Sequence, residues 1–192
     1  MIEKIVASSR SYRTFDESRA VTREELADLI SVARLCPSAM NRQPLKYRLV
    51  YEREEVEALL SITKWGGMLP ELILPPDGKH PTAFIVVCCD IELCNNIDSA
   101  RFDAGVVSQT IMLAAAEHDL GGCILGAFDK SRAAEILSIG EKNVPIVILA
   151  IGKPDEKVVL CDTDESGSIA YYRDEYGTHF VPKRSLEELI IK

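Results

Sequence analysis

Apolar residues recur along this chain with two spacings, one typical of helices and one typical of buried strands. Leu26, Leu29 and Ala33 are three or four residues apart, as on one face of an α-helix. In contrast, residues 83–89 form a continuous apolar run whose length suits a strand buried on both faces. These patterns predict helices at the N-terminus and over residues 22–36, 54–60, 98–118, 129–137 and beyond 185, and strands over residues 47–51, 83–89, 123–125 and 144–152.

Polar and glycine residues support several of these helix limits. Thr22 is followed by Glu25, and Ser185 by Glu188, at the spacing of a capping box, which satisfies free N–H groups at a helix start. The glycine pair 121–122 follows the longest predicted helix, and glycine is the expected residue at a helix end. We therefore expect this pair to stop the helix.

The order of the predicted elements indicates the fold class. Four or five strands among longer helices predict an α+β domain built in layers. The chain has 192 residues, enough to bury a substantial core, and contains no internal repeat, low-complexity stretch or linker. We therefore predict a single domain over residues 1–192.

The charge balance of the chain is acidic, with 22 Lys and Arg against 30 Asp and Glu and a net charge of −8. Such a chain does not offer a general surface for nucleic acid or anionic membranes, so any anion must be bound in a local pocket. No apolar run approaches the roughly 20 residues of a membrane span, and the first residues lack the pattern of a targeting leader. We expect a cytoplasmic protein with no membrane or nucleic-acid partner.

Neither the cysteines nor the histidines have the spacing of a metal site. The six cysteines include no CxxC pair, and Cys88 and Cys89 lie within an apolar run, which favours buried reduced thiols over disulfides or a metal cluster. The three histidines are far apart along the chain. The sequence therefore predicts no metal site.

Two groups of cations stand out against the acidic background. Arg10 and Arg13, with Ser11 between them, are either solvated side chains at a helix end or donors to a phosphate, whose geometry matches the planar fork of arginine. Lys183 and Arg184 precede the second capping box, where cations are unfavourable unless an anion lies near the exposed N–H groups. Solvated side chains are the alternative for this pair too.

Three further segments are candidates for ligand binding. The proline-bounded loop over residues 37–44 carries Ser38, Asn41 and Gln43, whose hydroxyl and amide groups suit a heterocycle edge or a polyol, although a satisfied turn is the alternative. The bare backbone of residues 121–122 would let a ring system lie against it, if the pair is more than a helix end. The irregular segment over residues 65–78 is either a lid or a surface excursion.

In their order along the chain, these segments resemble a small FMN-dependent nitroreductase-family flavoprotein. The resemblance covers nearly the whole length, and the shared order of the stretches makes it specific. It implies a nitroreductase-like three-layer α+β fold, with a central mixed, mainly antiparallel sheet flanked by helices, in an intertwined homodimer. The stretches are RSYRTF (10–15), PSAMNRQP (37–44), FDAGVVSQTIMLAAAEHDLGG (102–122), GAF (126–128), AIGKPDE (150–156) and VPKR (181–184).

The resemblance also implies an FMN site at the interface between the two subunits. By motif match, Arg10, Ser11 and Arg13 would bind the phosphate, ribityl chain and pyrimidine side of FMN. Lys183 and Arg184 would close on the phosphate. The remaining contacts would come from the loop of the partner subunit and from the backbone near the redox edge of the flavin, namely Pro37, Ser38, Ala39, Asn41, Gln43, Gly121 and Gly122.

The implied activity is that of an FMN-dependent NAD(P)H oxidoreductase. NADH or NADPH would reduce nitroaromatic, quinone or similar electrophilic acceptors by ping-pong hydride transfer through flavin N5, which requires no catalytic residue from the protein. Arg13 would stabilise the reduced flavin, and Tyr12, Trp65 and Met68 are candidates for the acceptor pocket. Ser9 departs from the family pattern, in which a further arginine is common at this position, so the number of phosphate-binding cations stays open.

Two other functions are compatible with the same resemblance. One is a same-fold flavoenzyme of different chemistry, such as reductive dehalogenation or flavin breakdown. The other is a non-catalytic FMN-binding or storage protein, which would bind FMN but be reduced only slowly by NAD(P)H. Neither the physiological acceptor nor the choice between NADH and NADPH follows from the sequence.

Overall fold

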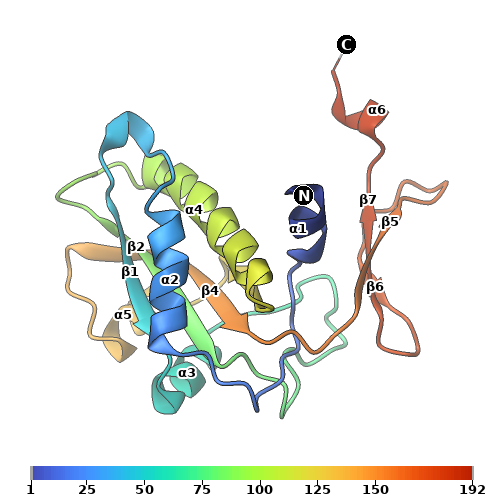
Figure 1. Cartoon of the computed structure of the whole chain (residues 1–192), viewed down its shortest axis with the longest axis horizontal. Coiled ribbons are helices and arrows are strands. Elements are labelled where there is room, and N and C mark those ends of the chain that lie inside the picture. Colours follow the sequence, from blue (N-terminus) through green and yellow to red (C-terminus); the bar gives the residue numbers. More distant parts are fainter. Residues whose placement is uncertain (1, 192) are drawn as a thin grey trace.

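Residues 2–191 are described by a computed structural model, in which helices cover both faces of a four-stranded sheet and a smaller sheet follows near the C-terminus (Figure 1). The elements in chain order are α1 (Ile2–Ser8), α2 (Arg23–Ala33), the 3-10 turn η1 (Ala39–Asn41), β1 (Leu45–Val50), α3 (Arg53–Leu60), β2 (Ala83–Asp90), α4 (Ile97–Glu117), β3 (Gly121–Leu125), α5 (Lys130–Ile136), β4 (Asn143–Gly152), β5 (Val158–Asp162), β6 (Tyr172–Arg173), β7 (His179–Lys183) and α6 (Leu186–Leu189).

The central sheet has the strand order β1-β2-β4-β3 and is antiparallel throughout. Its inner strand β2 is buried at every position, as its continuous apolar run predicts. Ile85 of β2 pairs with Leu49 on one side and with Leu149 on the other. Successive side chains of a strand point to opposite faces, so a strand this apolar needs a helical layer on each face.

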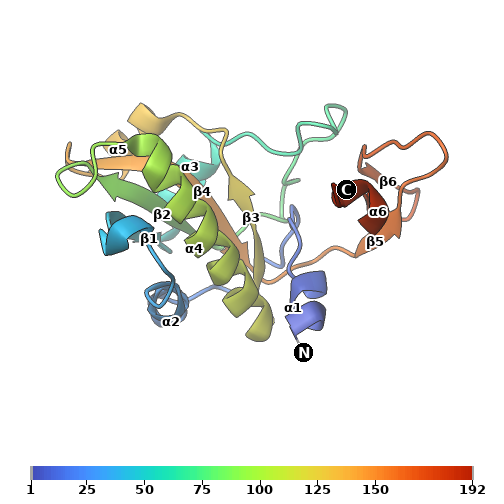
Figure 2. The same cartoon turned by 90° about the horizontal axis from the view of Figure 1, so that it is seen from above.

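Two pairs of helices supply these layers. Ile85 and Val87 of β2 belong to a core that includes residues of α2 and α4. Phe84 and Val86 point the other way, into a second core that includes Leu59 of α3 and a residue of α5. Figure 2 shows α4 crossing one face of the sheet. The predicted α+β three-layer fold is therefore confirmed.

The second sheet consists of β5, β7 and β6, with β5 and β7 parallel and β6 and β7 antiparallel. Its strands are short and mostly only partly buried, so they carry no clear apolar pattern, and the sequence does not predict them. Parallel pairing occurs in this second sheet and also at the outer edge of β3, where Ser11 forms a parallel bridge with Gly122. Figure 1 shows the second sheet beyond α1, apart from the central sheet.

The end of α4 differs from the prediction. The helix ends at Glu117, and Asp119 takes the left-handed conformation, with φ of 55°, that is usual for a glycine at a helix end. Gly121 and Gly122 already belong to β3. The prediction that the glycine pair stops the helix is therefore wrong, because Asp119 adopts the left-handed conformation in which aspartate is found more often than most residues.

The predicted capping boxes agree with the structure. Both capping boxes form, at Thr22 and at Ser185. All six cysteines are free, and four of them are buried. Burial raises the pKa of the Cys88 thiol to about 12, so this thiol stays protonated. Within residues 2–191, no helix is long and apolar enough to cross a membrane, and no three His, Cys, Asp or Glu side chains are grouped to hold a metal ion.

Candidate functional site

The N-terminal arginine segment, residues 9–13, lies along the outer edge of β3. Ser11 forms a parallel bridge with Gly122, and the Tyr12 N–H donates to the Gly122 carbonyl at 2.9 Å. Two candidate segments that are 110 residues apart in the chain, around Ser11 and around Gly121, are therefore brought together. The backbone pairing holds the arginines in register with the sheet.

The glycine pair allows this close approach. A Cβ on Gly121 would lie 2.6 Å from the Tyr12 ring, and a Cβ on Gly122 would lie 1.9 Å from the carbonyl oxygen of Ala150. The Tyr12 hydroxyl donates to the Ser8 carbonyl at 2.8 Å, and burial raises its pKa. In the single chain, the ring that lies against Gly121 is thus that of Tyr12, and both glycines are buried.

Arg13 is the most deeply buried cation of the segment, with 9% of its surface exposed. One guanidinium nitrogen donates to the Ser11 carbonyl at 3.2 Å and lies 3.2 Å from Nε2 of His179. The guanidinium also lies over the Tyr171 ring, 4.9 Å from its centroid. Its Nε is buried without a hydrogen-bond partner, so one donor is not used within the described part of the chain.

Glu156 connects the arginine segment to the second sheet. Its carboxylate accepts from the N–H groups of Arg13 and Thr14 and forms an ion pair with Arg173 at 2.6 Å, and its side chain is only 3% exposed. Glu156 belongs to the AIGKPDE stretch, but the sequence pattern gives it no role. Lys153, Asp155 and Lys157 stand beside it in the sequence, so no local charge pattern distinguishes Glu156 from the other charges of this loop.

His179 completes this buried cluster and was also missed. Burial and the neighbouring guanidinium groups of Arg13 and Arg173 lower its pKa from 6.5 to about 4, so the imidazole is neutral at pH 7. Arginine only donates, so Nε2 of His179 accepts and its proton lies on Nδ1. Nothing in the sequence marks this histidine, because the strand that carries it is short and its partners are distant in the chain.

Arg10 lies closer to the surface than Arg13. It donates to the Val6 carbonyl in the last turn of α1, and its Nε, like that of Arg13, is buried without a hydrogen-bond partner among residues 2–191. A buried donor left unpaired costs about 1–3 kcal/mol. The two unpaired Nε–H groups therefore favour a ligand with acceptor oxygens at this segment.

Lys183 and Arg184 are not joined to this segment. Both are exposed at the end of β7, and Arg184 pairs with Glu188 at 3.3 Å. Glu188 also caps α6 through Ser185, so the anion at this helix start is a side chain of the same helix. No hydrogen bond or ion pair within residues 2–191 links this pair to Arg10, and Figure 1 shows α6 beyond β7 near the C-terminus.

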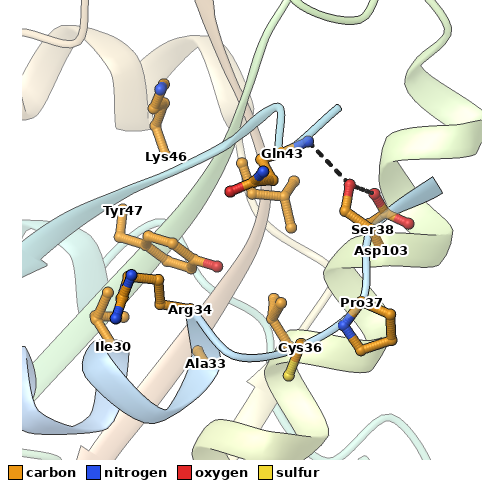
Figure 3. Close-up of a pocket in the computed structure, with 12 residues that line it drawn as sticks. Ile30, Ala33, Arg34, Cys36, Pro37, Ser38, Gln43, Lys46, Tyr47 and Asp103 are labelled. Carbon is orange, nitrogen blue, oxygen red and sulfur yellow. Dashed lines mark hydrogen bonds between the residues drawn. The ribbon is translucent and has the colours of Figure 1, made fainter. Parts of the chain in front are cut away.

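The loop over residues 37–44 lies at the start of α4. The Ser38 hydroxyl donates to Asp103 of α4, and the Gln43 amide donates to Oδ1 of Asn41 at 3.1 Å. Ala39, Asn41 and Gln43 are exposed. The loop forms one wall of a cavity of about 290 Å³ between α2, α4 and β1, which includes Pro37, Ser38 and Gln43 (Figure 3).

The loop and the arginine segment lie at opposite ends of α4. The loop is bonded to Asp103, whereas the arginine segment pairs with the strand that follows Glu117. At 1.5 Å per residue, the helix places about 21 Å between Asp103 and Glu117. The two segments of one chain therefore do not form a single small site.

The irregular segment that starts at residue 65 lies over the Arg13 cluster. Trp65 packs edge-on against Phe15, with ring centroids 6.5 Å apart, and its indole N–H donates to the Thr63 hydroxyl at 2.8 Å. The Met68 N–H donates to the Tyr171 hydroxyl at 3.1 Å, and the Met68 side chain is half exposed. The segment is thus tied to the second sheet next to the candidate site.

A family model described as "Nitroreductase family" matches residues 6–71 and 96–153 of this chain. The match includes the arginine segment, the loop over residues 37–44, and strands β3 and β4. It ends before the second sheet, so His179, Lys183 and Arg184 lie outside the matched residues.

Two archaeal proteins are similar to the chain over most of its length. One, from Archaeoglobus fulgidus, is 27% identical over 167 residues, which cover 84% of this chain and 90% of the relative. The other, from Methanothermobacter thermautotrophicus, is 30% identical over 156 residues, which cover 79% of this chain and 76% of the relative. Both are named "Putative NADH dehydrogenase/NAD(P)H nitroreductase".

Solved structures share the fold. A nitroreductase family protein from Streptococcus pneumoniae TIGR4 has a TM-score of 0.72 at 20% identity, with 100% of both chains covered. A "putative nitroreductase in complex with FMN" from Exiguobacterium sibiricum has a TM-score of 0.68 at 21% identity, covering 81% of this chain and 89% of that chain. An FMN-dependent nitroreductase from Clostridium difficile R20291 has a TM-score of 0.65 at 26% identity, covering 82% and 89%.

Proposed function

Because the chain belongs to the nitroreductase family, we propose that it is an FMN-dependent oxidoreductase that uses NADH or NADPH to reduce small electrophiles such as nitroaromatics and quinones. The names of its archaeal relatives support the nicotinamide donor. The FMN named with two of the solved structures supports the cofactor.

One observation of this chain carries the proposal. Arg10 and Arg13 each keep a buried Nε–H without a partner among the described residues, on a segment held against β3. A phosphate, ribityl chain or pyrimidine edge supplies the acceptor oxygens that these donors lack. The residues present therefore fit FMN, with Arg10 on the phosphate side and Arg13 on the pyrimidine side.

The protein contributes binding, orientation and electrostatics to the reaction. When bound, FMN supplies hydride transfer between the nicotinamide and the acceptor. Arg13 places a permanent positive charge in a buried setting, where it stabilises negative charge on a neighbouring ligand more strongly than it would in water. His179 stays neutral beside it, and as an acceptor it orients the guanidinium without competing for an anion.

We propose further that the working unit is a homodimer. The loop over residues 37–44 is bonded to Asp103, about 21 Å along α4 from the end of the helix that leads to the arginine segment of its own chain. A second copy packed along α4 would bring its loop, with Ser38, Asn41 and Gln43, to that segment. Each of the two sites would then use the arginines of one chain and the loop of the other.

Flavin uptake and reduction test the proposal. We expect the purified protein to bind added FMN, to turn yellow, and to lose that colour when NADH or NADPH is added without oxygen. Steady turnover of a quinone or nitroaromatic should follow, and a screen across these classes and enones would identify the acceptor. A protein that takes up no FMN would refute the proposal, whereas FMN binding with slow reduction by both nicotinamides would indicate a storage protein.

A further inference from the structure

The loop over residues 37–44 is fastened by a buried carboxylate on α4. Asp103 is 4% exposed, and its Oδ2 accepts from the Ser38 hydroxyl at 2.7 Å. Both of its oxygens also face the Ala39 N–H, at 3.1 and 3.2 Å. Ser38 Oγ in turn accepts from the Gln43 N–H at 3.0 Å, so a single carboxylate holds both limbs of the loop (Figure 3).

The conformation that this carboxylate holds is unfavourable by itself. Met40, Asn41 and Gln43 have φ values of 50°, 53° and 50°, in the left-handed region that residues other than glycine seldom adopt. A loop with three such residues is maintained only when its surroundings determine it. Within residues 2–191, the hydrogen bonds that join this loop to a helix are those that end at Asp103.

The hydrogen bonds within the loop also determine which of its donor and acceptor groups remain available to a ligand. The Ser38 hydroxyl gives its hydrogen to Asp103, so towards a ligand it can only accept. The Asn41 and Gln43 side chains are exposed, and the Gln43 amide donates a hydrogen bond to Oδ1 of Asn41. The amide of Asn41 makes no donor bond within residues 2–191, so it keeps its hydrogens for a ligand.

We propose that Asp103 is a positioning residue for flavin binding, which acts by holding the loop over residues 37–44 in its strained, ligand-ready conformation. The inference rests on the proposed function, since it assigns the loop to the FMN site. Asp103 itself touches no ligand in this scheme. Its effect passes through Ser38 and Ala39 to the exposed amides.

An Asp103→Asn substitution changes the hydrogen bonds of this side chain while keeping its size and packing. It keeps the shape of the side chain but leaves one acceptor oxygen in place of two, and it turns an NH₂ group towards donors on Ser38 or Ala39. Asp98→Asn is the matched control, because Asp98 lies on the same helix with its side chain 87% exposed. Ser38→Ala is a second variant that breaks the same network at a less buried residue.

Hydrogen exchange on the flavin-free protein tests the anchoring step without any activity. Hydrogen bonds to a charged group are strong enough that we expect the Ala39 and Gln43 amides to exchange roughly tenfold faster or more in Asp103→Asn and in Ser38→Ala. Amides of β2 should keep their wild-type rates, as should all of these amides in Asp98→Asn. If Asp103→Asn does not fold, Ser38→Ala decides the result.

FMN titration by fluorescence quenching tests the consequence. We expect the Kd for FMN to rise roughly tenfold or more in Asp103→Asn and to be unchanged in Asp98→Asn. Unchanged exchange of the loop amides would overturn the inference, and so would faster exchange with an unchanged Kd. Wild-type protein that binds no FMN would instead overturn the proposed function, and the inference with it.

Discussion

Arg10 and Arg13 are three residues apart in the chain, yet they have different surroundings. Arg13 is buried against Tyr171 and His179, whereas Arg10 bonds to the end of α1 near the surface. Both retain an unpaired buried Nε. At the scale of the residue, the proposed function depends on donors that the described chain leaves unused.

Removing Arg10 should affect the ligand more than the fold. We expect Arg10→Ala to raise the Kd for FMN about tenfold or more, because a charge-assisted hydrogen bond to phosphate is lost. The free energy of unfolding should change by less than about 1 kcal/mol, since only one bond to α1 disappears. Flavin titration and urea unfolding measure the two effects.

The control for this variant is Arg53→Ala, which removes an arginine that is 90% exposed on α3. This variant should keep the Kd for FMN and the free energy of unfolding near their wild-type values. An Arg10→Ala protein that keeps full FMN affinity would show that Arg10 does not bind the phosphate.

His179 predicts a pH dependence of stability. Its pKa is about 4 in the folded chain against 6.5 in the unfolded chain, so the unfolded state binds more protons between these values. The stability that neutral His179 provides is therefore present above pH 6.5 and is lost as the pH falls towards 4. Between pH 7 and pH 5 we expect a loss of about 2 kcal/mol from this residue.

Urea unfolding at pH 7 and pH 5 checks this expectation. His179→Gln keeps an acceptor for Arg13 but cannot titrate, so its loss between the two pH values should be about 2 kcal/mol smaller than in the wild type. His118→Gln, at an exposed histidine, should lose as much stability as the wild type. Equal losses in wild type and His179→Gln would contradict the buried, neutral histidine.

At the scale of the element, β3 connects the arginine segment to the core of the protein. It pairs with β4 on one side and with Ser11 and Tyr12 on the other. The central sheet therefore fixes the position of the arginine segment. Gly122 makes this possible, because any side chain there would overlap the Ala150 carbonyl.

A methyl group at this position should therefore be costly. We expect Gly122→Ala to destabilise the chain by about 3 kcal/mol, as overpacking of backbone against backbone does. Gly126→Ala is the matched control, since a Cβ there meets nothing within 4 Å. Thermal or urea unfolding of both variants provides the comparison, and equal stabilities would disprove the packing argument.

At the scale of the whole molecule, α4 separates the two halves of the proposed site and leaves some of its apolar residues exposed. Phe102 is 75% exposed on α4, and Ile124 on the neighbouring β3 is 43% exposed. Gly105 lies on the same helix in open space, where glycine costs about 1 kcal/mol relative to alanine without any gain within the chain. Close approach of a second α4 would account for all three.

We expect the protein to sediment as a dimer and Gly105→Arg to shift it towards the monomer. A long charged side chain blocks close helix packing, but within one chain it meets open space. FMN affinity should fall together with dimerisation, because the loop of the second copy is lost. Gly140→Arg, also in open space, should remain dimeric. A Gly105→Arg monomer with full FMN affinity would contradict the shared site.

The helices, the strands of the central sheet and the family could be predicted from the sequence alone. Long apolar runs and capping boxes are local signals, so the start of α2 and the burial of β2 and β4 follow from them. The end of α2 does not, because the helix ends at Ala33 and not at the predicted residue 36. The motif order also indicates the arginine segment and the proline-bounded loop. These signals need only neighbouring residues, which is why they can be read from one chain.

How the segments meet could not be predicted from the chain alone. The second sheet and its buried cluster of Glu156, Arg173 and His179 depend on partners distant in the chain, and no local pattern marks them. The glycine pair became part of β3 because contacts with Tyr12 and Ala150, and not the helix end, require glycine there. Asp103 likewise acquires its role from the loop packed against it, since burial and bonding arise only when the chain folds.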